Sequence, residues 1–148
     1  MISFFVPGNP KGQMRHRSTK SGHHYDPSAS DKKDFLAKAM QCRPDEPFSG
    51  PVCLRLICVF PRPKSHYRTG RHADTLKESA PIWHSSTPDW DNVGKFVGDA
   101  LNSIFWKDDR LIVRGIVDCI YGDTPGIHVQ IREPAPEDIE EVLALQAH

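Results

Sequence analysis

The sequence lacks the features that would place the protein in a membrane or outside the cell. None of its apolar runs approaches the roughly 20 residues that a membrane-spanning helix needs. Its first residues lack the basic start and the long apolar stretch of a secretory signal. The 4 cysteines show no Cys-x-x-Cys spacing, which disfavours both a zinc site and a disulfide framework. We therefore expect a cytoplasmic protein with no membrane partner.

The chain also lacks a net charge, because its 19 basic and 19 acidic residues cancel when histidine is neutral. Zero net charge argues at first against a nucleic-acid partner, but the charges are unevenly distributed. Residues 1–33 contain six Lys or Arg and two acidic residues, and residues 55–77 contain six and one. Residues 133–148 contain five acidic residues and no Lys or Arg. A basic surface with an acidic tail elsewhere can bind a phosphate backbone.

The chain is organised around residues 88–109, where acidic residues flank a predicted helix. Asp89 and Asp91 stand at its start, and Asp108 and Asp109 follow it, just before a run of strand-forming residues. The apolar face of this helix repeats with a period of 3.6 residues and comprises Val93, Phe96, Val97, Ala100, Leu101 and Ile104. Whether the two acidic pairs lie close together therefore depends on how the chain folds.

Carboxylates clustered at such a place have two interpretations. Like charges repel in a partly buried site, and a divalent cation such as Mg²⁺, which prefers hard oxygen ligands, removes the conflict. Lys95, one helical turn after Asp91, could then stabilise the extra charge on a phosphate in the transition state. Under either interpretation we expect Asp91 or Asn92 to be the N-cap of the helix. The alternative is an ordinary helix start, with acids favoured by the helix dipole and Lys95 in a simple ion pair.

This segment resembles a known family. The runs P-D-W-D-N-V-G-K and D-A-L-N, followed by F-W-K-D-D-R-L-I, are similar in order and spacing to the core of the RusA family of Holliday junction resolvases. These are small Mg²⁺-dependent endonucleases of phage and prophage origin that act as homodimers on four-way DNA junctions. The resemblance implies that Asp89, Asp91 and Asp109 are catalytic ligands of Mg²⁺, or alternatively Mn²⁺, and that Lys95 is the catalytic lysine. Some relatives carry a basic residue where this chain has Pro88, so a phosphate contact there is absent.

Two basic segments are candidate DNA-binding elements. Residues 7–28 form a glycine-bearing basic loop after the first strand, where the resemblance to the family is looser than in the acidic core. Residues 61–87 are long and proline-bearing, which is typical of a functional or disordered loop, and we interpret them as a flexible basic arm. The alternatives are a solvated loop and a plain disordered connector. The candidate phosphate contacts are Lys11, Arg15, Arg17, Lys64, Arg68 and Arg71.

The pattern of elements predicts an α/β fold in one RusA-like domain, residues 1–148, with a mixed sheet and flanking helices. We expect the order strand, helix, strand, helix, strand, strand, helix, with the last two strands joined as a hairpin by a Gly-Asp-Thr-Pro-Gly turn. The acidic C-terminal helix, within residues 134–148, has an apolar side that must dock on the domain or on a second subunit. Beside the helix after Asp91, the expected elements cover residues 2–6, 29–41, 52–60, 110–121, 127–132 and 136–146.

The sequence thus predicts a Mg²⁺-dependent, structure-selective endodeoxyribonuclease, encoded by a bacterium or a phage. It would resolve Holliday junctions by paired phosphodiester hydrolysis in DNA recombination and repair. Two matched cuts need two sites, so we expect a homodimer with two-fold symmetry, with the first strand and the last helix as the candidate interface. The alternatives are a nuclease for other branched DNA, such as flaps or forks, and a catalytically silent DNA-binding module.

Overall fold

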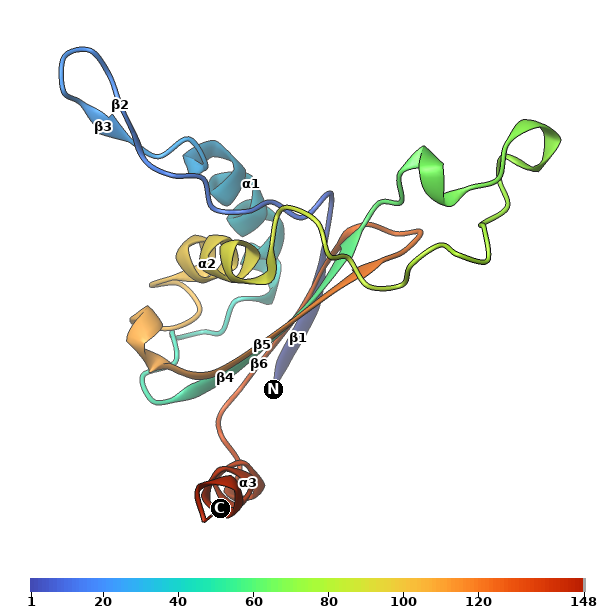
Figure 1. The fold of residues 1–148 in the computed structure, drawn as a ribbon. Helices are drawn as coiled ribbons and strands as arrows, with labels where there is room; N and C mark the ends of the chain where they lie inside the picture. The colour runs from blue at the N-terminus through green and yellow to red at the C-terminus, as the bar shows by residue number, and fades with distance from the viewer. Residues whose placement is uncertain (148) are drawn as a thin grey trace.

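A four-stranded sheet with two helices on one face forms the body of the protein in this computed structural model, which describes residues 1–147 (Figure 1). The strands are β1 (Ile2–Pro7), β4 (Val52–Phe60), β5 (Ile112–Tyr121) and β6 (Gly126–Arg132). The helices are α1 (Ala29–Ala39), α2 (Trp90–Leu101) and α3 (Pro136–Gln146). None of these helices is long and apolar enough to cross a membrane. The predicted α/β fold with a mixed sheet is confirmed.

The sheet has the order β1–β6–β4–β5, and β4 is its central strand. β4 pairs antiparallel with β6 on one side and parallel with β5 on the other. The predicted hairpin of the last two strands is therefore wrong, because β5 and β6 both pair with β4 and not with each other. The physical reason is burial: β4 is apolar on both faces and is mostly buried, whereas β5 is mostly half-buried and lies at the sheet edge.

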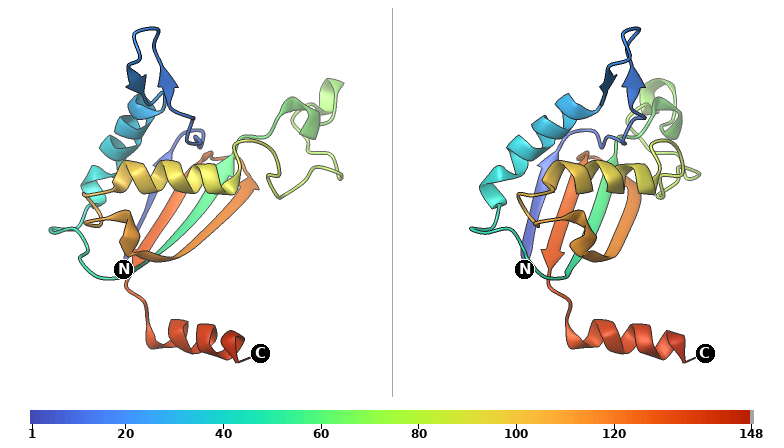
Figure 2. Two further views of the ribbon diagram at one scale, coloured as in Figure 1. Left: turned by 60° about the vertical axis from the view of Figure 1, so that its left-hand side comes forward. Right: turned by 90° about the vertical axis from the view of Figure 1, so that its left-hand side faces the viewer.

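The two helices α1 and α2 pack side by side on the same face of the sheet (Figure 2). Because β4 and β5 are parallel, α2 must run back across the sheet to connect them. Phe35 of α1 meets Phe96 of α2 edge to face, with ring centroids 5.9 Å apart. The predicted apolar face of α2 is confirmed: its buried residues include Val93, Phe96, Val97, Ala100 and Leu101, and Ile104 packs against them.

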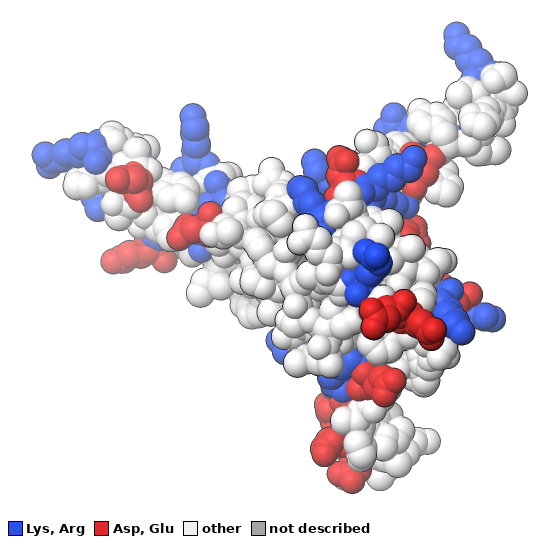
Figure 3. All heavy atoms as spheres, turned by 180° about the vertical axis from the view of Figure 1, so that it is seen from behind, with Lys and Arg blue, Asp and Glu red and all other residues white. Residues whose placement is uncertain are grey.

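Two arms project from the body at the end of the sheet where α2 begins (Figures 1 and 2). The first arm is the hairpin of β2 (Arg17–Ser18) and β3 (His24–Tyr25), which lies inside the predicted basic loop of residues 7–28. The second arm is residues 61–81, which contain two short 3₁₀ turns. Figure 3 shows Lys and Arg side chains on both arms and acidic side chains gathered over α3.

α3 lies away from the two-helix layer, beyond the opposite end of the sheet (Figure 2). Its first turn is tied to the body by Asp138, which accepts hydrogen bonds from Arg132 at 2.6 Å and from Arg114 at 3.0 Å. Its apolar side chains remain exposed, from 51% for Val142 to 72% for Leu145. The predicted docking on the domain is therefore limited to this ionic contact and its neighbours, and most of the apolar side of α3 faces outward.

Candidate active site

The start of α2 carries two neighbouring carboxyl groups. Asp89 is the N-cap residue, and its side chain accepts a hydrogen bond from the backbone N–H of Asn92 at 3.3 Å. Asp91 lies in the first helical turn, so the expectation that Asp91 or Asn92 caps the helix is wrong. Asp89 can cap because its backbone is extended, which a capping residue requires. Lys95 follows one turn later, with its Nζ 3.5 Å from the Asp91 carboxylate.

The electrostatics at this end keep Asp91 ionised. The pKa of Asp91 lies below its ordinary value, first because the Asp89 side chain hydrogen-bonds to it and then because of the positive charge of Lys95, although desolvation acts in the opposite direction. The N-terminal end of a helix also favours negative charge. The Asp91 side chain is 44% exposed, so a ligand can reach it. Two adjacent carboxyl groups are hard oxygen donors, a set that fits Mg²⁺ with water and phosphate oxygens in the remaining positions.

The second acidic pair lies at the other end of α2. Asp109 begins a 3₁₀ turn, η4 (Asp109–Leu111), that leads into β5. Because α2 runs back across the sheet between two parallel strands, its two ends lie at opposite ends of the sheet (Figure 1). At about 1.5 Å per residue, the 12 residues of α2 separate these ends by about 18 Å. Within one chain, therefore, Asp109 does not meet Asp89 and Asp91.

Asp108 has a local structural role at that far end. Its side chain caps the 3₁₀ turn by accepting a hydrogen bond from the backbone N–H of Arg110 at 2.9 Å. That hydrogen bond and the Arg110 charge lower the pKa of Asp108. Across residues 1–147, no three His, Cys, Asp or Glu side chains are grouped so that they could hold a metal ion. A Mg²⁺ site provided by one chain would therefore rest on Asp89 and Asp91.

A groove of about 390 Å³ lies beside Asp89. Its walls are the segment that follows the second arm, the start of α2 and the second half of β5. Trp83, Trp90 and Asp118 were not predicted as site residues from the sequence. Two signals were visible: Trp90 stands between two aspartates, and Asp118 is an acid within the apolar run of β5. The residues that line the groove include Trp83, Ser85, Ser86, Asp89, Trp90 and Asp118.

The wall that carries Trp83 is fixed to the edge of β5. The backbone N–H of His84 donates to the carbonyl of Cys119 at 3.0 Å, and the N–H of Tyr121 donates to the carbonyl of Ile82 at 2.9 Å. The predicted flexible arm of residues 61–87 therefore ends earlier, where its chain joins the sheet. The His84 ring stacks on Phe60 with 3.6 Å between ring centroids, and burial lowers the pKa of His84, which favours the neutral imidazole.

The base of the first arm crosses the start of α2 on its other side. The backbone N–H of Gln13 donates to the carbonyl of Asn92 at 3.0 Å. A Cβ atom on Gly12 would lie 2.7 Å from the Cβ of Pro88, so only glycine allows this close approach. The predicted phosphate contact Lys11 is thereby brought next to the segment that carries Asp89.

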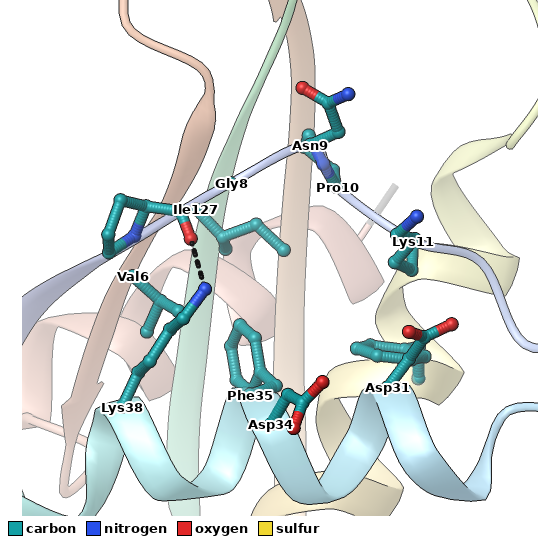
Figure 4. Close-up of a pocket in the computed structure, with 12 residues that line it drawn as sticks. Val6, Gly8, Asn9, Pro10, Lys11, Asp31, Asp34, Phe35, Lys38 and Ile127 are labelled. Atoms are coloured by element: carbon teal, nitrogen blue, oxygen red, sulfur yellow. Dashed lines mark hydrogen bonds between the residues drawn. The ribbon is translucent and has the colours of Figure 1, made fainter.

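A second hollow, of about 150 Å³, lies under residues 8–11 and is shown in Figure 4. Lys38 from α1 reaches across it and donates to the carbonyl of Pro7 at 3.2 Å. Asp31 and Asp34 line it together with basic side chains, so its charges are mixed. We interpret this hollow as the contact that seats the loop on α1 and not as a phosphate site.

The six predicted phosphate contacts are all exposed, and none of them makes an ion pair within the described part of the chain. They divide between the two arms and the loop at the base of the first. The start of α2 is flanked by the base of each arm, because it contacts Gln13 on one side and shares a groove with Trp83 on the other. Free cationic side chains are thus placed on both sides of a carboxylate pair. The six are Lys11, Arg15, Arg17, Lys64, Arg68 and Arg71.

Comparisons with known proteins identify the family of the chain. The family described as Endodeoxyribonuclease RusA matches residues 7–132, from the end of β1 through β6. The chain is also 36% identical over 137 residues to the uncharacterized protein YqaN of Bacillus subtilis (strain 168), and this match covers 89% of the chain and 96% of that protein. The resemblance seen in the sequence is confirmed. Because the family match covers most of the chain, including β4, β5, β6 and both packed helices, the chain belongs to the RusA family of endodeoxyribonucleases.

Proposed function

We propose that the protein is a Mg²⁺-dependent endodeoxyribonuclease that resolves four-way DNA junctions. Family membership supports nuclease activity on DNA. The observation that carries the proposal is the pair Asp89 and Asp91 at the start of α2, between the bases of two arms with exposed cationic side chains. Carboxylates alone would repel a phosphate backbone, whereas carboxylates that hold a divalent cation between basic arms can receive it.

Different residues of the chain would bind the metal ion and stabilise the transition state. Asp89 and Asp91 would hold Mg²⁺, with Mn²⁺ as an alternative, through their carboxylate oxygens. Such an ion, when bound, neutralises a phosphate oxygen and lowers the pKa of a water molecule that can attack the phosphodiester. The lowered pKa of Asp91 keeps that side chain ionised at neutral pH. Lys95, one turn along the helix and 3.5 Å from Asp91, would stabilise the negative charge that develops on the phosphate.

The arms support a branched substrate. They leave the body in different directions, as Figure 1 shows, so a single straight duplex would not follow both. Two duplex limbs that diverge from a branch point would each meet one arm, and the branch point would then lie at the start of α2. The phosphate contacts would hold the DNA without reading its sequence, and the attraction would weaken with salt.

In a homodimer, Asp109 of one subunit would complete the metal site of the other. Paired cuts need two sites, and a two-fold dimer supplies them in register. Within one chain Asp109 lies beyond the far end of α2, a helix about 18 Å long, so in the proposed dimer Asp109 of the partner subunit would complete the site with Asp89 and Asp91. The exposed apolar side of α3 supports the interface that we expect from α3 and β1. The carboxylate that could replace Asp109 within the chain is Asp118, which lines the groove beside Asp89.

Cleavage of labelled DNA tests the proposed function. Four-way junctions, forks, flaps and linear duplexes are incubated with the protein in Mg²⁺, Mn²⁺, Ca²⁺ or EDTA. We expect paired, symmetrical cuts in the four-way junction with Mg²⁺ and none in EDTA. Preferential cutting of forks or flaps would favour a nuclease for other branched DNA. Binding of the junction with no cutting in any metal would favour a silent DNA-binding module.

Mixed dimers test the position of Asp109. Chains with Asp89→Asn and Asp109→Asn are coexpressed with different affinity tags, and the heterodimer is purified. If the site combines two subunits, the heterodimer keeps one complete site and nicks one strand, while each homodimer is inactive. An inactive heterodimer contradicts this arrangement, and loss of cleavage in Asp118→Asn would then identify the carboxylate within the chain. A monomer in sedimentation at micromolar concentration that still makes paired cuts would rule out the dimer.

A further inference from the structure

We propose that the groove beside Asp89 binds an unstacked nucleobase of the DNA against the indole rings of Trp83 and Trp90. The proposal rests on the proposed function, because it gives the nuclease site a subsite for one base of its substrate. The groove of about 390 Å³ is open to solvent at the start of α2, next to the carboxylates that would receive the scissile phosphate. A base attached to that phosphate, or to a neighbouring one, is therefore within reach of the groove.

Both indoles are exposed although their backbones are fixed. Trp83 and Trp90 are each 65% exposed, while the third tryptophan, Trp106, is completely buried. Trp83 lies between two residues whose backbones hydrogen-bond to β5, and Trp90 is the first residue of α2, directly after its N-cap. Two large aromatic rings that share one groove on rigid backbone form a preorganised apolar surface, which loses little conformational entropy when a ligand binds.

The other groove residues favour a base over a phosphate. Asp89 and Asp118 contribute carboxyl groups, and carboxylates repel a phosphate unless a cation intervenes. The charge of Asp118 is partly balanced by Arg55, whose Nη2 lies 3.4 Å from its carboxylate. A nucleobase is neutral, stacks on indole rings whatever its identity, and carries amino groups that can donate to carboxylates or hydroxyls. Ser85 and Ser86 add hydroxyls on the same wall.

A branch point provides an unstacked base at a lower free-energy cost than a continuous duplex does. In a continuous duplex each base is stacked on both sides and paired, so its face is not available to an indole. Moving a base out of the stack costs a few kcal/mol, and the cost is least where pairing or stacking is already disturbed. In the open form of a branch point the last base pairs have lost a stacking neighbour. The groove would therefore favour branched over linear DNA at the nucleotide next to the cut.

The proposed contact is tested by removing either partner, the base from the DNA or the indole from the protein. Four-way junctions are prepared with one abasic branch-point nucleotide at a time, and binding is measured in Ca²⁺. We expect Trp83→Ala and Trp90→Ala to bind the intact junction about tenfold more weakly, a typical effect of losing one base–aromatic stack. On the junction that lacks the stacked base, the variants and the wild type should bind equally. Trp83→Phe keeps an aromatic face and should recover most of the affinity.

The neighbouring Ile82 supplies the matched control. It is 66% exposed, does not line the groove and pairs with β5 through its backbone, so Ile82→Ala should bind like the wild type. A second readout is photocrosslinking of 5-iodouracil placed at each branch-point position. The crosslink should map to Trp83 or Trp90 and should disappear in the corresponding alanine variant. Crosslinks that map only elsewhere would overturn the proposal.

Three further outcomes separate this proposal from its alternatives and from the proposed function. If both alanine variants bind every junction as the wild type does, the base subsite is wrong, while selective cleavage of junctions still supports the nuclease. If the variants lose the same affinity on intact and on all abasic junctions, or if they sediment as monomers while the wild type is a dimer, the indoles contact something other than a base and the proposal fails. If the protein shows no preference for branched DNA, quenching of its tryptophan fluorescence by single-stranded oligo(dT), lost in the alanine variants, supports base binding independently.

Discussion

At its C-terminal end α2 runs into the core, whereas at its N-terminal end it carries charged and aromatic side chains to the surface. Leu101, Phe105 and Trp106 are all completely buried, and Trp106 bridges to Phe48. At the other end Trp90 is 65% exposed. A tryptophan thus packs in the core at one end, whereas a tryptophan at the other end is available to a ligand. The comparison indicates that the C-terminal end contributes mainly to stability and that the N-terminal end contributes mainly to function.

The largest expected effect is on stability at the buried end. Trp106→Ala should lower the free energy of unfolding by about 3–5 kcal/mol, the usual result of deleting a buried aromatic side chain. Trp90→Ala should change it by less than about 0.5 kcal/mol, because the ring is mostly in solvent. Urea unfolding followed by circular dichroism measures both. Equal losses from the two variants would contradict the division between the ends of α2.

The next largest effect is on cleavage at the exposed end. Asp89→Asn and Asp91→Asn should each lower the cleavage rate by about 100-fold or more, because the neutral amide holds Mg²⁺ weakly. Asn also caps helices well, so the fold should persist in Asp89→Asn. Junction binding in Ca²⁺ should survive, since the arms carry it. Normal cleavage by both variants, or loss of binding together with the fold, would mean that the carboxylates are structural.

Asp99 provides the control for those variants on the same helix. It lies two turns after Asp91, and its carboxylate forms an ion pair with Lys32 at 3.1 Å. Lys32 also forms an ion pair with Asp26 at the base of the first arm. Asp99→Asn removes one exposed carboxylate charge without touching the start of α2. We expect the Asp99→Asn variant to cleave DNA at nearly the normal rate. A loss of cleavage as large as that of Asp91→Asn would mean that removal of any negative charge on α2 slows the reaction.

A smaller effect should follow from removal of the lysine near the acids. Lys95→Ala should slow cleavage by about tenfold even at saturating Mg²⁺, because its proposed role is on the phosphate and not on the metal ligands. Its ion pair with Asp91 is exposed on both sides, so stability should hardly change. Cleavage rates over a Mg²⁺ titration separate the two roles. Full recovery at high Mg²⁺ would assign Lys95 to metal binding.

The pH dependence of stability distinguishes the wall of the groove from the core end of α2. Burial lowers the pKa of His84 below that of the unfolded chain, where the imidazole binds its proton near the ordinary pKa of 6.5. The stabilisation by neutral His84 is therefore complete above about pH 6.5 and is lost as the pH falls below that value. We expect the melting temperature to fall less on acidification in His84→Phe, which keeps the stacking on Phe60. An identical fall in both proteins would contradict the assignment.

The smallest expected effect concerns single phosphate contacts. Arg15→Ala and Arg68→Ala should each reduce the slope of log affinity against log salt by about 1, because one fewer counterion is released. Both side chains are exposed and unpaired in the described chain, so folding should be unaffected. Fluorescence anisotropy of labelled junctions over a salt series measures the slope. An unchanged slope in both variants would mean that the arms are only solvated surface.

The sequence predicted most of the elements because local periodicity reports burial. The helix after Pro88, its apolar face and the doubly apolar β4 were all visible as patterns of residues. The pairing of β5 was not, because its neighbour is a distant strand, and a short turn to β6 suggested a local hairpin. The small hairpin of the first arm was also missed, since two-residue strands leave no pattern.

For the candidate site, the order of residues specifies which side chains are available, and the folding of the chain brings some of them together. Asp89, Asp91 and Lys95 are neighbours because helical geometry joins residues that are close in sequence. Asp109 is separated from them because a crossover between parallel strands must span the length of the sheet. Only the folded chain brings Trp83 and Asp118 beside Asp89, since pairing at the edge of β5 joins segments that are far apart in sequence.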